Sequence, residues 1–440
     1  MHPPLKPPHM FTKNSVGFSD ANDALNYLFS SFVNRHFLHR GKHDREFRRP
    51  DVLIGLARKL NVLPKPSHTC IVTGSKGKGT VSRMVAWNLS ATGLRVGLVL
   101  TPEEVSHLDR IRIGERIISE RDFCRILGIL RPVLDEAINS QPDDFYFAPT
   151  GIFLLVAMVW FREQGVDMWV IEGGRGAKFD EIGLIHAKIG IITNVLLEHT
   201  VRLGPTIENI AVDKLSLASR CETLIVGKSL LTWSHLIPWH YGNIQVVESP
   251  CDWQKTAARP QWLGELNVVS NAAVQYFCPG LPWHHFDTPA FFFAYGGVQG
   301  GDGRVIQGTV CCDAAIHPDC LDIGFLQRTG LSEGAALIGL SEDKDGEGIL
   351  SALTVAGFSH LFTVGLTSRV RHIRAWESTG KTVKQVAEIE VIGNLESGLL
   401  VKVLEMANLH NSLYVVGVQV FIRSMRQVLK VGLMNPMDLV

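Results

Sequence analysis

Short runs of β-branched and apolar residues alternate with helix-like segments along most of the chain. In the first half, runs of this kind lie at 70–72, 95–100, 168–171, 189–193 and 223–226. Between the first two runs, apolar residues at 81–89 recur at helical spacing. Strands that alternate with helices build a mainly parallel, largely buried sheet. The alternation therefore predicts an α/β fold.

A second series of the same kind follows a change in composition. Residues 278–308 are rich in Gly and Pro, as domain boundaries often are. After them, further strand candidates lie at 309–314, 335–340, 360–366 and 412–418. A chain of 440 residues also exceeds the usual length of one domain. We expect a flexible N-terminal tail at 1–15, a first α/β domain at 16–295 and a second at 296–440.

Charge and composition argue against several classes of partner. Lys plus Arg and Asp plus Glu both number 43, so no net charge favours nucleic acid or a membrane surface. The longest apolar stretch, 152–161, is too short to span a bilayer and is expected to be a buried helix. The eight cysteines form no CxxC pair, and the proline-rich start lacks an apolar signal core. These features predict a soluble cytoplasmic protein; they predict no oligomeric state.

The stretch CIVTGSKGKGTV, residues 70–81, has the strand–turn–helix order of a phosphate-binding loop. Glycines let the backbone curl so that N–H groups face a phosphate, and the helix N-terminus favours negative charge. Lys78 would neutralise phosphate oxygens, and Thr80 would reach a Mg²⁺ ion. The strict P-loop pattern is not met, because Gly79 separates Lys78 from Thr80. An ordinary turn with surface lysines is the alternative. The predicted nucleotide-binding residues are Gly74, Ser75, Lys76, Gly77, Lys78, Gly79 and Thr80.

The loop, with this departure from the strict pattern, resembles the loop of one known family. VTGSKGKGTV is similar to the V-A-G-T-N-G-K-G-S loop of folylpolyglutamate synthases, members of the Mur ligase superfamily. Further stretches resemble the family's motifs in order and spacing: 97–119, 166–181 and 189–214, then 312–318, 340–345 and 415–426. The resemblance implies a P-loop ATPase-type domain with a mainly parallel sheet, followed by a smaller Rossmann-like domain.

The resemblance also implies a reaction and its participants. A substrate carboxylate attacks the γ-phosphate of ATP to give an acyl phosphate, and an amino acid's amine displaces the phosphate to form an amide. ATP and Mg²⁺ are the implied cofactors, and a small-molecule carboxylate and an amino acid are the implied substrates. The chemistry needs positioning and charge neutralisation above all.

Particular residues match the family's functional positions in the first half. The match implies that Thr80 and Glu172 ligate Mg²⁺ and that His199 holds a second metal ion. Lys214 matches a lysine that is carbamylated in the family, and it is counted with Lys78 and His199 among the catalytic residues. From the residues alone, a solvated loop residue is the favoured interpretation of Glu172 and a structural histidine that of His199. A surface lysine is the alternative for Lys214.

Fewer residues match in the second half. Asp313 matches the aspartate of the family's D-G-A-H-N motif and is expected to be catalytic. Arg304 falls where an arginine contacts nucleotide phosphates in the family, although Asp302 replaces the preceding proline. Asn267 or Asn271 stands near the position of an asparagine close to adenine, with the spacing one residue off.

Several positions depart from the family pattern, whereas the predicted triphosphate and metal ligands are kept. The departures are Glu103 and Ile316 in place of histidines, His317 in place of asparagine, Glu198 in place of aspartate, and the added cations Lys76, Arg175 and Lys178. The added cations suggest an anionic substrate, with surface solvation as the alternative. The pattern predicts an acid–amino-acid ligase acting on a folate. A ligase for a different acid and a non-catalytic ATP-binding protein remain alternatives.

Overall fold

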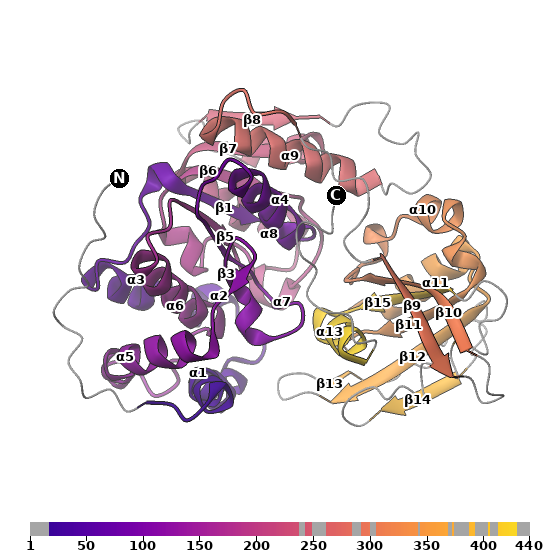
Figure 1. Ribbon diagram of the computed structural model, residues 1–440, viewed down its shortest axis with the longest axis horizontal. Coiled ribbons are helices and arrows are strands. Elements are labelled where there is room, and N and C mark those ends of the chain that lie inside the picture. The colour runs from indigo at the N-terminus through magenta and orange to yellow at the C-terminus, as the bar shows by residue number, and fades with distance from the viewer. Residues whose placement is uncertain are drawn as a thin grey trace. The chain divides into compact units, whose positions relative to one another are not determined.

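The structure is a computed structural model (Figure 1). It describes residues 17–236, 243–248, 261–283, 292–299, 305–341, 344–367, 372–373, 387–391, 404 and 412–428. Contacts divide the chain into two units, Met1–Ser249 with Glu265–His284, and Pro250–Gly264 with His285–Val440. The expected boundary at 295/296 falls inside a strand, β9 (Phe292–Gln299), of the second unit's sheet.

An eight-stranded sheet forms the centre of the first unit, in the order β4-β3-β2-β5-β1-β6-β7-β8. The strands are β1 (Thr69–Thr73), β2 (Val96–Val99), β3 (Ile111–Ile113), β4 (Arg116–Ile117), β5 (Met168–Glu172), β6 (Ala187–Ile192), β7 (Cys221–Gly227) and β8 (Asn243–Val247). All neighbours from β2 to β8 pair in parallel, and the β3–β4 hairpin adds an antiparallel edge. The strands expected from the sequence in this half are confirmed.

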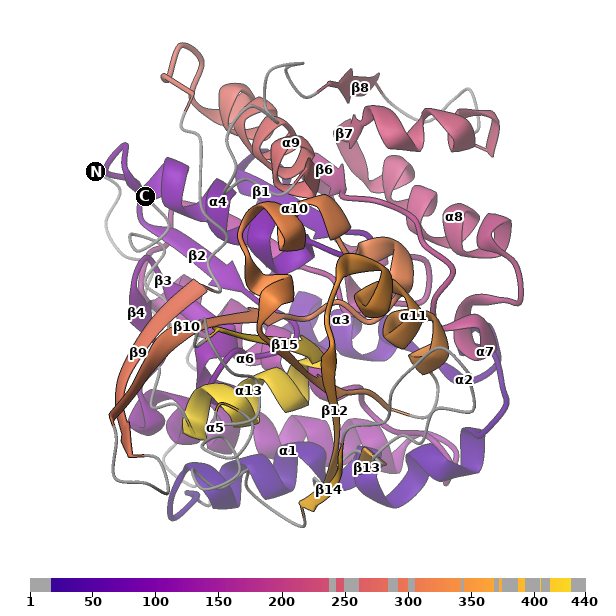
Figure 2. The ribbon, with the colours of Figure 1, turned by 90° about the vertical axis from the view of Figure 1, so that its right-hand side faces the viewer.

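Helices cover both faces of this sheet. They are α1 (Ala21–Arg35), α2 (Asp44–Phe47), α3 (Pro50–Lys59), α4 (Lys78–Ser90), α5 (Glu120–Asn139), α6 (Pro149–Glu163), α7 (Thr200–Leu203), α8 (Ile207–Leu215) and α9 (Gln261–Phe277). Helices α4 and α9 lie on one face, and α6 lies on the other with α1, α3 and α5 outside it (Figures 1 and 2). Every residue from Gly151 to Phe161 in α6 is buried, which confirms the expected buried helix.

The strand order brings three carboxyl ends together. β1 lies between β5 and β6 and pairs with both in parallel, with Val72 opposite Glu172 and Thr73 opposite Ile192. The chain leaves β1 through α4 toward β2 and leaves β6 through α8 toward β7, in opposite directions along the sheet. A parallel sheet binds ligands outside the strand ends at such a switch point. The segments that follow β1, β5 and β6 therefore share the position where a ligand is expected.

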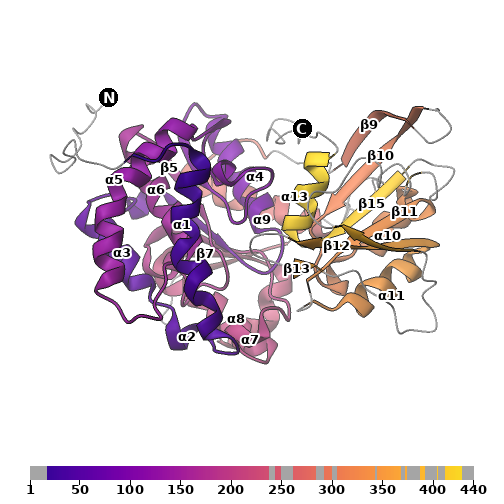
Figure 3. The ribbon, with the colours of Figure 1, turned by 90° about the horizontal axis from the view of Figure 1, so that it is seen from below.

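The second unit is built on a seven-stranded sheet. Its order is β13-β12-β11-β15-β10-β9, with β14 paired to β12. The remaining elements are β10 (Val305–Asp313), α10 (Ile323–Arg328), β11 (Ala335–Gly339), α11 (Gly346–Ala356), β12 (His360–Thr367), β13 (His372–Ile373), β14 (Ala387–Val391), β15 (Ser412–Gly417) and α13 (Gln419–Val428). β9 and β13 are antiparallel to their neighbours, and the other pairs are parallel. Helices α10 and α11 cover one face and α13 the other (Figures 1 and 3). The two α/β sheets confirm the expected fold class.

Two further sequence expectations concern the membrane and the cysteines. Among the helices in the described ranges, none is both long and apolar enough to cross a membrane. The described cysteines are all free thiols, and Cys70, Cys311, Cys312 and Cys320 are buried. At these four positions the cysteines are small buried side chains.

Candidate functional site

The glycine-rich loop joins β1 to α4 and passes tightly against the segment that follows β6. Gly74 has φ +138°, and a Cβ there would lie 2.0 Å from Thr193 Oγ1. Gly77 caps α4 with φ +82°, and its Cβ would lie 2.7 Å from Leu266 Cδ1 on α9. Glycine is needed at both positions because other residues rarely adopt these backbone angles and have no room for a side chain.

Asn194 and Thr193 hold this loop by hydrogen bonds. The Ser75 N–H donates to Asn194 O (3.0 Å), and the Lys76 N–H donates to Asn194 Oδ1 (2.8 Å). Thr193 Oγ1 donates in turn to Lys76 O (2.6 Å). The N–H groups of Ser75 and Lys76 therefore maintain the shape of the loop. The N–H groups that lack a helical partner at the start of α4, beginning at Lys78, are the better donors for a phosphate.

Lys78 lies at the first position of α4 with its ammonium group folded over the loop. Its Nζ donates to Gly74 O (3.1 Å) and to Ser75 O (3.3 Å). Both acceptors are neutral carbonyls, and a phosphate oxygen is a stronger partner for an ammonium. Lys78 is thus placed within its own loop, where it can pair with a phosphate bound at the N-terminus of α4.

Glu172 ends β5 beside the start of α4. The side chain is buried, and one carboxylate oxygen, Oε2, accepts the Thr101 N–H at 2.9 Å. A Cβ on Gly79 would lie 3.4 Å from the same oxygen, so the carboxylate touches the first turn of α4. Burial raises the pKa of Glu172 to about 7, although the charge of Lys78 opposes the rise.

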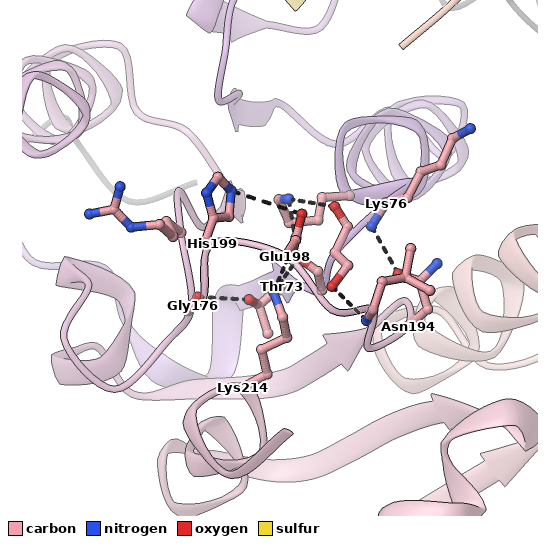
Figure 4. A network of polar contacts seen from close by, with 12 residues as sticks. Thr73, Lys76, Gly176, Asn194, Glu198, His199 and Lys214 are labelled. Atoms are coloured by element: carbon pink, nitrogen blue, oxygen red, sulfur yellow. Dashed lines mark hydrogen bonds and ion pairs between the residues drawn. The ribbon is translucent and has the colours of Figure 1, made fainter. Parts of the chain in front are cut away.

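Glu198, His199 and Lys214 form a cluster beyond β6 (Figure 4). Lys214 Nζ donates to Gly74 O (2.8 Å) and to Glu198 Oε1 (3.3 Å). His199 Nε2 lies 3.8 Å from Glu198 Oε2. The backbone of His199 has φ +52°, a conformation that is uncommon for residues other than glycine and is often found at functional sites.

The charges in this cluster depend on one another. Burial by itself would raise the pKa of Glu198, but Lys214, His199 and Lys78 outweigh it and hold that pKa below its usual value. Burial lowers the pKa of Lys214, and Glu198 opposes that fall. Glu198 therefore supplies the negative charge beside the ammonium of Lys214, whose side chain is 1% exposed.

The arrangement is compatible with a nucleotide and Mg²⁺. Mg²⁺ is usually bound by one or two carboxylates together with substrate phosphates and water. Glu172 supplies a carboxylate at the helix N-terminus where the phosphates are expected, and Thr80 lies in the same turn of α4. Among the described residues, no three His, Cys, Asp or Glu side chains converge into a complete metal site. The roles of Thr80, Glu172 and His199 as metal ligands remain predictions.

The two candidate asparagines lie on α9, which packs against the loop. Asn267 and Asn271 are both buried, and Asn271 Nδ2 donates to Asn267 O at 2.9 Å. Leu266, beside Asn267, contacts Gly77, and Ser270 Oγ lies 3.7 Å from Met84 Sδ on α4. The helix therefore supports the phosphate loop, while contact with an adenine stays a prediction.

In the second unit, Asp313 ends β10 and is buried. Its Oδ2 accepts the hydroxyl of Tyr414, on the neighbouring strand β15, at 2.8 Å. His317 Nδ1 accepts the Asp319 N–H (3.2 Å) and caps a short 3₁₀ turn, a structural use for a residue that departs from the family pattern. Arg304 lies outside the described residues.

The departures in the first unit are largely paired with charges of opposite sign. Arg175 Nη2 and Nε donate to the two carboxylate oxygens of the buried Asp44, at 2.6 and 2.9 Å. Arg110 Nε donates to Glu103 Oε2 at 2.8 Å, and His107 Nδ1 lies 3.2 Å from Glu103 Oε1. Asp44 accounts for the charge of Arg175, so Arg175 no longer supports the inference of an anionic substrate.

Sequence reasoning assigned no role to Asn194, Thr193 or Thr101. The letters TN at 193–194 lie within a stretch already matched to the family, which is the signal that was available for Asn194 and Thr193. Thr101 belongs to another matched stretch, but its backbone contact with Glu172 depends on the pairing of β2 with β5.

Comparison with known proteins gives partial matches in sequence. The chain is 33% identical over 157 residues to a probable bifunctional folylpolyglutamate synthase/dihydropteroate synthase of Haloferax volcanii, covering 36% of this chain and 18% of that protein. It is 31% identical over 156 residues to the folylpolyglutamate synthase of Lacticaseibacillus casei, covering 36% of each. A dihydrofolate synthase/folylpolyglutamate synthase of Haemophilus influenzae matches at 25% identity, covering 48% of this chain and 47% of that protein. These matches span from a fifth to about half of the relatives' lengths, and no family model matches.

Solved structures match over nearly the full length. The folylpolyglutamate synthase of Thermotoga maritima has a TM-score of 0.65 at 19% identity, covering 94% of this chain and 98% of that one. The bifunctional folylpolyglutamate synthase/dihydrofolate synthase of Yersinia pestis, solved with AMPPNP and a Mn ion, has a TM-score of 0.68 at 18% identity, covering 96% and 100%. In sequence over part of its length and in fold over nearly all of it, the chain is folylpolyglutamate synthase-like, as its motifs predicted.

Proposed function

We propose that the chain is a cytoplasmic, ATP- and Mg²⁺-dependent ligase that joins a small-molecule carboxylate to an amino acid through an acyl phosphate. The observation that carries the proposal is the convergence of three segments at one edge of the first sheet. The phosphate loop follows β1, Glu172 ends β5, and Glu198 and His199 follow β6. The named relatives are folylpolyglutamate synthases, which supports the same reaction class.

Each group would have a distinct task in the reaction. The N–H groups at the start of α4 would hold phosphate oxygens, and Lys78 would neutralise the charge that phosphoryl transfer spreads over them. Glu172 and Thr80 would hold Mg²⁺, which would supply positive charge to neutralise the phosphates. In the second unit, Asp313 accepts the hydroxyl of Tyr414, and its match to the family motif supports a catalytic role. The stated residues bind, orient and neutralise charge, and the reacting groups come from the substrates.

Two classes of carboxylate substrate are candidates for the proposed ligase. A folate-like acid with glutamate as the amine is the first candidate, because it is what the relatives' names specify. A different acid is favoured by the loop after β2, where Glu103 replaces the family histidine and is joined to Arg110 and His107. That change places a buried ion-pair network next to Thr101, whose N–H contacts Glu172.

ADP release separates these possibilities. The purified chain is incubated with ATP, Mg²⁺, a panel of acids including reduced folates, and a panel of amino acids. Release that requires both an acid and an amine supports a ligase, and the acid that works identifies the substrate class. Tight ATP binding without turnover for any pair would replace the ligase with a non-catalytic ATP-binding protein.

Lys78→Ala tests the phosphate site within this assay. We expect turnover to be abolished, while Lys59→Ala, which removes an exposed lysine at the end of α3, leaves it unchanged. A Lys78→Ala variant that keeps more than about a tenth of the rate has lost less than about 1.4 kcal/mol of barrier lowering. That result would rule out the proposed phosphate role.

A further inference from the structure

A cavity of about 220 Å³ lies in the first unit, beside the segments that follow β5 and β6. Its walls come from α2 and the residue before it, from the loop after β5, and from α7 and α8. Cavities that hold a whole small-molecule ligand usually measure about 300–1,000 Å³. This cavity is therefore of a size for one end of a substrate.

Two contacts join the cavity to the candidate site. Helix α7, which carries Arg202, begins directly after His199, and the Arg202 N–H donates to His199 O at 2.8 Å. A Cβ on Gly176 would lie 2.2 Å from Asp213 Oδ1 in the cavity wall. Gly176 O accepts the hydroxyl of Thr73, at the end of β1, at 2.9 Å (Figure 4). The cavity thus lies beside the edge of the sheet where the reacting groups are expected.

The guanidinium of Arg202 is held at this cavity, and no carboxylate in the described part of the chain pairs with it. Nη1 donates to two backbone carbonyls, His39 O (2.9 Å) and Lys42 O (3.2 Å), and Cζ lies 5.2 Å from the centroid of the Phe47 ring. Burial, and after it the charge of Arg175, lower the pKa of Arg202. An anion beside the guanidinium would oppose both effects.

Other arginines of the first unit have carboxylate partners. Arg48 pairs with Glu181 at 3.1 Å, and Arg175 pairs with Asp44 at 2.6 Å. At the cavity, by contrast, Arg45 is exposed and forms no ion pair with another described residue. Guanidinium groups match the geometry of carboxylate and phosphate oxygens, which they contact through paired N–H donors. Two arginines at one cavity therefore favour an oxyanion as its ligand.

Asp213 is the acidic residue among the described residues that line the cavity. Its Oδ1 accepts the N–H groups of Ala177 (2.6 Å) and Lys178 (3.4 Å), so the carboxylate is already bound to backbone donors. Asn209 Oδ1 accepts the Thr206 N–H (3.3 Å), which leaves its amide Nδ2 as a donor for a ligand. Two guanidiniums against one carboxylate give the cavity wall a net positive charge.

We propose that the cavity binds a second anionic group of the acid substrate, a carboxylate or a phosphate, in addition to the carboxylate that is activated. Arg202 and Arg45 contact its oxygens, and Asn209 donates a hydrogen bond. The substrate is accordingly an acid that carries at least two anionic groups. The inference rests on the proposed function in placing an acid at this edge of the sheet, whereas binding of an oxyanion in the cavity requires no turnover.

Titration calorimetry at constant ionic strength tests the cavity without catalysis. The probes are inorganic phosphate and succinate, and the probe that binds more tightly identifies the anionic group. We expect saturable binding to the parent chain and a loss of more than about tenfold in affinity for Arg202→Gln, because a charged hydrogen-bond donor is removed. Arg58→Gln should bind normally. It is the matched control, because Arg58 is exposed in the last turn of α3 and forms no ion pair with another described residue.

Two further variants make the calorimetry decisive. Arg45→Gln changes an exposed side chain and should weaken binding about two- to fivefold, so it tests the cavity even if circular dichroism shows that Arg202→Gln does not fold. Lys78→Ala should retain the cavity's binding, because it alters only the phosphate loop. The inference is overturned if no probe binds saturably to the parent chain, if affinity is unchanged in every arginine variant that folds, or if Lys78→Ala abolishes all binding.

The ADP-release assay tests the assignment of this group to the acid substrate. For an acid with two anionic groups, Arg202→Gln should raise KM by more than about tenfold while kcat changes less, as expected for lost substrate binding. Equal KM values in the parent chain for that acid and for an analogue with an amide in place of the second group would overturn the assignment. Absence of turnover with every acid would count against the proposed function, and the calorimetry then decides the oxyanion site by itself.

Discussion

Replacing Gly74 by alanine tests the geometry of the phosphate loop most directly. The glycine has φ +138°, and a Cβ would lie 2.0 Å from Thr193 Oγ1 and 2.9 Å from Thr193 N. The Thr193 N–H donates to Thr73 O at 3.0 Å and continues the pairing of β6 with β1. Thr193 therefore cannot move aside without opening the sheet, and the loop must move instead.

The cost can be built from separate contributions. A residue with a side chain held in this sparsely populated conformation costs about 1–3 kcal/mol. Relieving the contact disrupts the hydrogen bond from Thr193 Oγ1 to Lys76 O, worth about 1 kcal/mol. We expect Gly74→Ala to lower the free energy of unfolding by about 2–4 kcal/mol. Gly93→Ala is the control, because Gly93 has φ +86° and nothing within 4 Å of its Cβ, and it should lose only about 1–2 kcal/mol.

Thermal unfolding and nucleotide binding provide the measurements. For a unit of this size, about 1 kcal/mol corresponds to roughly 2–4 °C in Tm. Gly74→Ala should unfold at a lower temperature than Gly93→Ala and should bind an ATP analogue more than tenfold more weakly than the parent chain. Gly93→Ala should bind normally. Equal Tm values and normal binding for both variants would refute the geometry described for the loop.

Further predictions concern pH and buried polar groups. Folding raises the pKa of Glu172 from 4.5 to about 7, so between these pH values the folded state holds a proton that the unfolded state has lost, and this group's contribution to stability falls as pH rises through that window. Mg²⁺-dependent binding of an ATP analogue should instead fall as pH drops through about 7, because the carboxylate becomes protonated. Glu172→Gln should abolish both trends, measured by urea unfolding and by binding titrations at several pH values. Glu104→Gln should lower the free energy of unfolding by about 3 kcal/mol or more, because it leaves Arg83 without its buried ion pair. Adding Arg83→Met to the same chain should recover part of that loss. If the losses of the two single variants simply add in the double variant, the pairing is contradicted. Tyr414→Phe should cost about 1–3 kcal/mol in urea unfolding, since the buried Asp313 carboxylate loses a donor; an unchanged midpoint would contradict the contact.

Much of the fold was predictable because its signals are local. A parallel strand buried on both faces needs a continuous apolar run, and the strands β1, β5 and β6 are read directly from such runs. The short hairpin β3–β4 was not predicted. Its five residues carry too little pattern, and pairing with β2 determines where they lie.

In the candidate site too, the residues with a local sequence signal were predicted, and those without one were missed. Gly74, Gly77 and Lys78 were predicted together because a phosphate loop is one contiguous stretch that follows a strand. Glu172 was expected at a strand end, and the structure places it against the first turn of α4. Asn194 was missed, because an asparagine after a strand has no distinctive local pattern and its role comes from a bond to Lys76.

By itself, the sequence determined an α/β protein with a phosphate loop and a set of charged residues at strand ends, because periodicity and glycine placement act over short distances along the chain. Only the tertiary structure decided how those charges pair. Arg175 is joined to Asp44, and Lys214 is joined to Glu198 rather than exposed at the surface. Opposite charges brought together by strand order and buried away from water determine one another's roles, and no local pattern records which partner each will meet.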